Sequence, residues 1–241
     1  MYVPSQCMTC MGGGLVMMVL PEGEQVDGFM AILSLDSRRW ELIPTSEMPC
    51  LISPWCIFAL GQTLYVGGCI DDQDHASLVT YDTETAGWGQ LESELVCGAF
   101  TDCIVVEDTA YLLTYQSEEE TEEVVWSYRE GNGFSRHGTL PQMIGCLSME
   151  SFGRHIIMVA SLEADELLHH VSYSTVSGES VVYDTVGDES SHMSWTPIGP
   201  DVQFVVDSLG DSPYRTARIT LPGGDDYVSA GRWNVMDPDH N

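Results

Sequence analysis

The sequence predicts an all-β fold that is built from a repeated unit of about 46 residues. Short apolar segments alternate with polar turns along the whole chain, which is the pattern of short strands. Equivalent residues recur at one offset: Tyr65 and Tyr111 lie 46 positions apart, as do Trp88 and Phe134. Outside residues 161–178, no apolar pattern with the period of a helix extends over three turns.

Each repeat supplies about four short strands at a period of about 45–50 residues, which is the spacing of β-propeller blades. A β-sandwich would explain the short strands but not the fixed offset. The clearest repeat runs from Cys56 to Leu91. In this repeat an apolar strand is followed by Gly67–Gly68, which predicts an inter-strand turn. A second strand ends at Tyr81–Asp82, and Trp88 follows after a polar turn.

This order of a glycine pair, Tyr-Asp and Trp resembles a kelch repeat, and the resemblance extends with varying quality over nearly the whole chain. It implies that the glycines permit a tight turn between strands and that the Tyr and Trp side chains pack between neighbouring blades. These residues are therefore expected to be structural. They are Gly67, Gly68, Tyr81, Asp82 and Trp88, with Asp36 and Trp40 in the first repeat and Tyr183, Asp184 and Trp195 in the fourth.

Residues 1–241 are predicted to form a single kelch-like propeller domain of about five four-stranded blades, at residues 1–49, 50–95, 96–141, 142–199 and 200–241. The distance from Phe134 to Trp195 predicts an insert of about fifteen residues within 161–178. There, Leu167–Tyr173 would form an extra strand or a short helix. Kelch propellers usually close with six or seven blades, so five repeats indicate either a closed ring of five or a truncated, divergent propeller.

The chain is strongly acidic, with 37 Asp and Glu residues against 8 basic residues and a net charge of −29. All the basic residues are arginine, so the chain contains no lysine. Such a surface repels nucleic-acid phosphates and anionic lipids, and neither is expected as a partner. It attracts a basic protein or peptide, and solubility is the other interpretation of the acidity.

The eight cysteines lie mostly within apolar segments, where free thiols behave as small hydrophobic groups. No segment has the roughly 18 consecutive apolar residues that cross a bilayer. The N-terminal segment lacks the basic residues of a signal peptide. The sequence therefore predicts a cytoplasmic protein in a reducing compartment.

No metal site and no cofactor are predicted. Cys7 and Cys10 have the spacing of half a zinc site, but Cys50 and Cys56 are too far apart for the other half. His169–His170 lie near acidic residues, yet adjacent residues on a strand point to opposite faces. A solvated surface loop is the expected place for this histidine pair.

Partner-binding residues are expected in the loops that join strands and blades, because the resemblance implies binding through these loops. The loop at Asp71–Asp74 resembles part of a calcium-binding loop but lacks the glycine and the terminal glutamate of an EF-hand at the right spacing. Its counterpart in the third repeat, Glu118–Glu123, is either a contact for a basic partner or a solvated run of charge. The candidate residues are Asp71, Asp72, Asp74, His75, Glu118, Glu119, Glu120, Arg154 and Arg215.

The resemblance implies a non-enzymatic protein-interaction module, for which substrate recognition in a cullin-RING ubiquitin ligase is the commonest role. The absence of lysine agrees with that role, since a lysine-free receptor escapes modification of its own side chains. Compositional drift in the source genome is the other explanation of the missing lysine. The alternatives are a cytoskeletal or scaffolding kelch protein and a propeller enzyme of the galactose-oxidase type. No stretch matches the copper site of that enzyme, and no nucleophile or phosphate-loop motif occurs.

Overall fold

In the computed structural model, the described residues form strands joined by turns. The structure describes residues 8–11, 14–19, 29–44, 48–49, 52–70, 76–91, 100–114, 122–162, 168–187, 192–199, 202–208, 215–220 and 232–236. No element within these ranges is a helix with the length and apolar character needed to cross a membrane. The expected all-β class is confirmed.

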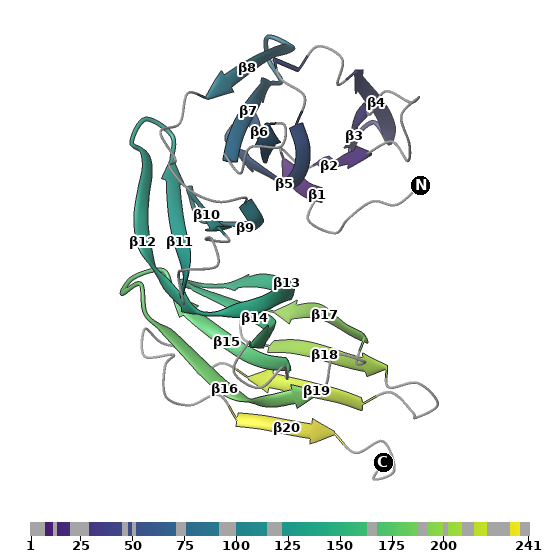
Figure 1. The fold of residues 1–241 in the computed structure, drawn as a ribbon. Helices are drawn as coiled ribbons and strands as arrows, with labels where there is room; N and C mark the ends of the chain where they lie inside the picture. The colour runs from purple at the N-terminus through teal and green to yellow at the C-terminus, as the bar shows by residue number, and fades with distance from the viewer. Residues whose placement is uncertain are drawn as a thin grey trace. The chain divides into compact units, whose positions relative to one another are not determined.

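The described strands form five sheets of four strands each, in which neighbours in the chain are paired (Figure 1). The first sheet consists of β1 (Met8–Met11), β2 (Gly14–Val19), β3 (Phe29–Ser34) and β4 (Arg39–Pro44), and the second of β5 (Ile52–Leu60), β6 (Thr63–Ile70), β7 (Ala76–Asp82) and β8 (Gly87–Leu91). The third consists of β9 (Phe100–Val106), β10 (Thr109–Thr114), β11 (Glu122–Arg129) and β12 (Gly133–Pro141). The fourth consists of β13 (Met143–Phe152), β14 (His155–Leu162), β15 (Leu168–Ser174) and β16 (Ser180–Gly187), and the fifth of β17 (His192–Gly199), β18 (Val202–Ser208), β19 (Arg215–Thr220) and β20 (Arg232–Met236).

The chain divides into two compact units, Met1–Gly138 and Thr139–Asn241. In the first unit, the first strands of successive sheets are in contact, with β1 against β5 and β5 against β9. In the second unit, β13 lies against β17. Four-stranded sheets that follow one another through their first strands are arranged as the blades of a β-propeller, and this part of the predicted fold is confirmed.

The sheet β5–β8 is buried on both faces, because alternate residues of a strand point to opposite sides. One face packs against the first sheet in a cluster that joins Val16, Met18, Met30 and Ile43 to Ile57, Leu64, Val66, Val79 and Tyr81. The other face packs against the third sheet in a cluster that joins Cys56, Phe58, Leu60, Tyr65 and Leu78 to Ala110, Leu112 and Tyr128. None of these residues is more than 6% exposed, so the two clusters form the core of the first unit.

A buried tyrosine near the end of the third strand recurs in three sheets. It is Tyr81 in β7, Tyr128 in β11 and Tyr173 in β15, and each pairs with the second residue of the preceding strand. In two sheets the fourth strand adds an aromatic ring. The ring centroids of Tyr81 and Trp88 are 5.0 Å apart, and those of Tyr128 and Phe134 are 4.7 Å apart. The predicted equivalence of Trp88 and Phe134 is therefore confirmed.

The fourth repeat contains no insert within residues 161–178, and the prediction of one is wrong. Leu167–Tyr173 was expected to be an additional element, whereas Leu168–Ser174 is the ordinary third strand β15 of a four-stranded sheet. Tyr173 takes the place of Tyr128, and the two lie 45 positions apart. The period therefore continues unbroken into the fourth sheet.

The predicted equivalence of Tyr183, Asp184 and Trp195 with Tyr81, Asp82 and Trp88 is also wrong. Tyr183–Asp184 lie in the fourth strand β16, and Trp195 lies in β17, the first strand of the next sheet. The blade limit expected at residues 199–200 falls instead between β16 and β17. Tyr173–Ser174 has the same local character as Tyr183–Asp184, and only the pairing of β15 with β14 distinguishes the two.

Gly67–Gly68 lie inside β6 and not in a turn, so the predicted glycine turn is wrong. Gly67 pairs with Cys56 and Gly68 pairs with Pro54, and a bulge in β5 lies between these two partners. A glycine within a strand often accompanies such an irregularity. The turn that precedes this strand, between β5 and β6, contains Gly61 with a φ of 57°.

The first-sheet counterpart of Asp82 is Ser34 and not Asp36. The Ser34 hydroxyl accepts the backbone N–H of Ser37 at 3.2 Å, at the start of the β3–β4 turn. In the β7–β8 turn the Asp82 carboxylate accepts backbone N–H groups at 2.8 and 3.0 Å. These bonds, that of Thr85 first, lower the pKa of Asp82. Asp36 is exposed within the turn.

Trp40 holds the strand position of Trp88, because Trp40 pairs with Leu33 as Trp88 pairs with Tyr81. It is nevertheless 49% exposed. The first sheet packs against the second through its other face, which carries Met30 and Ile43. The expected packing of Trp40 between blades is wrong for the described part of the chain.

His169–His170 lie in β15 and are buried, at 8% and 1% exposed, so the expected surface loop is wrong. His155 in β14 is also buried. His155 pairs with Ser174 and His170 with Val159, which places both imidazoles on one face of the sheet. Burial lowers the pKa of His170 to about 3 and also lowers that of His155.

Replacement of the fully buried Tyr173 by alanine is expected to lower the free energy of unfolding by about 3 kcal/mol, because it removes a large core side chain. Urea unfolding followed by fluorescence measures the change. Val176→Ala in the following turn is the matched control, since Val176 is 67% exposed. It should change stability by less than about 0.5 kcal/mol. Equal effects of the two substitutions would contradict the assignment of Tyr173 to the core.

Acidification is expected to destabilise the protein through His170. The folded state keeps this imidazole neutral down to about pH 3, whereas the unfolded chain takes up the proton near pH 6.5. The free energy of unfolding therefore falls as the pH drops below 6.5, by about 1.4 kcal/mol between pH 7.5 and 5.5.

Urea unfolding of the wild type and His170→Gln at these two pH values measures this contribution. The variant should lose about 1.4 kcal/mol of the pH dependence. His155→Gln gives a second measurement, with a change in the same direction. Identical pH dependence in all three proteins would refute the role of the buried histidines.

Candidate functional site

Most of the candidate residues from the sequence lie outside the described part of the chain and stay predictions. These are Asp71, Asp72, Asp74, His75, Glu118, Glu119 and Glu120. Arg154 lies exposed in the turn between β13 and β14, and Arg215 begins β19 in the next sheet. Within the described ranges, no three His, Cys, Asp or Glu side chains are grouped as metal ligands would be.

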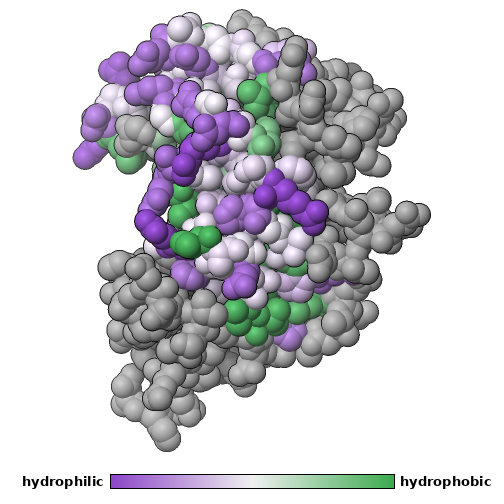
Figure 2. Space-filling view, turned by 90° about the vertical axis from the view of Figure 1, so that its left-hand side faces the viewer, coloured by the Kyte–Doolittle hydropathy of each residue, from purple (hydrophilic) through white to green (hydrophobic). Residues whose placement is uncertain are grey.

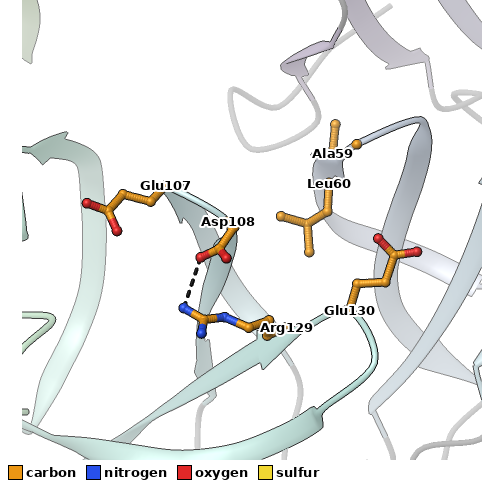
Figure 3. Close-up of a pocket in the computed structure, with 7 residues that line it drawn as sticks. Ala59, Leu60, Glu107, Asp108, Arg129 and Glu130 are labelled. Carbon is orange, nitrogen blue, oxygen red and sulfur yellow. Dashed lines mark hydrogen bonds and ion pairs between the residues drawn. The ribbon is translucent and has the colours of Figure 1, made fainter.

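A pocket of about 350 Å³ lies in the first unit where three hairpin turns approach one another. The turns connect β5 with β6, β9 with β10, and β11 with β12. The lining residues are Ala59, Leu60, Gly61, Glu107, Asp108, Arg129 and Glu130 (Figure 3). The pocket lies near the N-terminal end of β6, whereas the candidate loop at residues 71–75 follows the C-terminal end of that strand.

Three carboxylates and one guanidinium surround the pocket. Arg129 Nη2 donates to Asp108 Oδ1 at 2.9 Å, and Arg129 Nε donates to Thr109 Oγ1 at 3.1 Å. Figure 3 shows Glu107 and Glu130 on either side of this ion pair and Leu60 pointing into the space between Asp108 and Glu130. The lining therefore combines three acidic side chains with the apolar side chain of Leu60.

The Arg129–Asp108 ion pair has counterparts in two other sheets. In each of the three sheets, a residue at or just after the end of the third strand forms a hydrogen bond with the turn between the first and second strands. The bond reaches the second residue of that turn, 21 positions earlier in the chain. The three pairs are Thr83 Oγ1 to the Gln62 carbonyl (2.9 Å), Arg129 to the Asp108 carboxylate (2.9 Å) and Thr175 Oγ1 to the Arg154 carbonyl (2.7 Å). Arg129 therefore connects the end of β11 to the β9–β10 turn of the third sheet, and it also contributes a positive charge to the pocket.

The first residue of this hairpin turn has a positive φ in three successive sheets. The values are 57° for Gly61, 57° for Glu107 and 54° for Gly153, and the residues are 46 positions apart. Two-residue hairpin turns favour such angles because they match the twist of the strands, and glycine adopts them without steric cost. Glu107 thus places a charged side chain at a position that glycine occupies in the neighbouring repeats.

An aromatic cluster lies in the same pair of sheets. The rings of Phe58 and Tyr65 stack with centroids 4.9 Å apart, and the Tyr128 hydroxyl donates to the Tyr65 hydroxyl at 3.5 Å. Burial, followed by this hydrogen bond and the charge of Glu130, raises the pKa of Tyr65 well above its ordinary value. Tyr65 therefore remains a neutral phenol at physiological pH and has a structural role.

The pocket residues were not singled out from the sequence, although a signal for them existed. Glu107–Asp108 are polar residues between two apolar segments, which is the pattern of a turn, and the 46-residue period makes them the equivalents of Gly61–Gln62 in the preceding repeat. The remaining step was to recognise Arg129 and Glu130 in the β11–β12 turn as neighbours of Asp108. That contact depends on the pairing of β10 with β11, which brings Ala110 opposite Tyr128.

No protein-family model matches the chain, and no curated protein matches it significantly. Among solved structures, the chain is similar to a protein from Lactobacillus plantarum, with a TM-score of 0.59 and 10% identity over 98% of this chain and 71% of that one. It is also similar to a chain from a structural and mechanistic study of two prolyl endopeptidases, with a TM-score of 0.57 and 12% identity over 96% of this chain and 36% of that one. At these identities the likeness concerns the fold alone.

Glu107→Gly is expected to raise the free energy of unfolding by about 1 kcal/mol, because glycine adopts a φ of 57° without the clash of a Cβ atom. Thermal or urea unfolding measures the change. Glu84→Gly is the matched control, since Glu84 is an exposed turn residue without a positive φ. This control should lower stability by about 0.5–1 kcal/mol. A loss of stability in both variants would show that the Glu107 side chain stabilises the turn.

Proposed function

We propose that the protein is a non-enzymatic interaction module of the β-propeller type, which binds a basic protein or peptide at the hairpin-turn end of its second and third sheets. The observation that carries this proposal is the pocket at Glu107, Asp108 and Glu130. There, the side chains of three acidic residues line the pocket together with a single guanidinium, which is already bonded to Asp108. A cationic side chain entering the pocket gains more attraction from the carboxylates than repulsion from Arg129.

The shape and chemistry of the pocket suit an arginine or lysine side chain of the partner. Ala59 and Leu60 provide an apolar surface for the aliphatic stem, and Glu107 and Glu130, which also line the pocket, supply carboxylates for the charged head. Carboxylates bind a guanidinium through paired, charge-assisted hydrogen bonds. The net charge of −29 adds long-range attraction, which raises the rate of encounter with a basic partner.

The propeller is proposed to be of the kelch type. This proposal is supported by a buried tyrosine that lies near the end of the third strand in three sheets. In two of these sheets, an aromatic side chain of the fourth strand contacts the tyrosine. Trp88 and Phe134 are these aromatic side chains. The resemblance implies a protein-binding role for such blades, with the strand residues as framework and the connections as contact surfaces.

A specific role as the substrate receptor of a cullin-RING ubiquitin ligase in the cytoplasm is favoured by the lysine-free sequence. A receptor held beside the ligase is exposed to ubiquitin transfer, and a chain without lysine offers no side-chain amine for it. The basic partner would then be the substrate. A cytoskeletal partner is less compatible with the charge, because acidic filaments repel a chain of −29.

The protein is expected to bind a nona-arginine peptide, and binding should weaken as salt rises from 50 to 300 mM, because screening reduces the attraction between exposed charges. The double variant Glu107→Gln/Glu130→Gln should bind the peptide about five-fold more weakly, since it loses two exposed ionic contacts. Fluorescence anisotropy of a labelled peptide measures both effects.

The matched control is Asp36→Asn/Glu84→Gln, which removes the same charge from exposed turns of the first and second sheets. It should weaken binding by less than two-fold. Equal weakening by the two double variants would mean that net charge and not the pocket attracts the peptide. A wild-type protein that does not bind nona-arginine at low salt would overturn the proposed function.

Affinity purification of the tagged protein from its own cells is expected to recover a cullin or a cullin adaptor together with a basic substrate. Inhibition of the proteasome should increase the recovered substrate, because a ligase substrate is otherwise degraded. Repeated recovery of basic partners without any ligase component would contradict the receptor role and leave the interaction module in place.

A further inference from the structure

We draw no further inference here: the strongest candidate, the apolar face of the first sheet that carries Leu33 on β3 and the exposed Trp40 and Leu42 on β4, is a surface for which nothing in the described part of the chain shows what covers it.

Discussion

The packing of the sheet β5–β8 between its two neighbours is the interaction on which the first unit depends. A four-stranded sheet with apolar residues on both faces cannot exclude water from either face by itself. Ile57 and Phe58 illustrate the consequence, because these consecutive residues belong to different clusters, one shared with the first sheet and one with the third. Each fully buried aliphatic or aromatic side chain contributes about 1.5–3 kcal/mol. The repeat in the sequence is therefore also the unit of packing.

The turn between the first and second strands recurs in three sheets with the same positive φ but with side chains of different chemistry. Gly61, Glu107 and Gly153 share a positive φ of 54–57°, and a hydrogen bond between residues 21 positions apart holds the turn in each of these sheets. In the third sheet that bond is an ion pair between side chains that are 49% and 70% exposed, so it contributes little to stability. It does, however, hold the Asp108 carboxylate of the pocket against Arg129. Strand pairing supplies the geometry, and the turn residues supply the charge.

The acidic surface and the buried histidines of this protein respond to different solution conditions. On the side drawn in Figure 2, hydrophilic residues predominate over the upper part of the described surface, and the hydrophobic residues form separate areas. One face of the fourth sheet buries the polar side chains of His155, His170 and Ser172 beside the apolar Ile157 and Val159. A neutral imidazole is compatible with that environment and a protonated one is not. The stability of this sheet is thus coupled to pH, whereas the acidic surface responds mainly to salt.

The sequence alone determined the all-β class, the 46-residue period and the equivalence of Trp88 with Phe134, because alternating apolar residues and turn residues act over a few positions. Only the tertiary structure decided that Tyr173 and not Tyr183 is the tyrosine near the end of the third strand of the fourth sheet. It also decided that His169–His170 are buried and that Glu107, Asp108 and Glu130 meet at one pocket. Each of these outcomes depends on the pairing register between strands, and a local pattern that occurs twice cannot specify which copy is paired. The fold class could therefore be predicted from the local alternation of apolar and polar residues. The pocket could not, because it forms only where turns from separate parts of the chain come together.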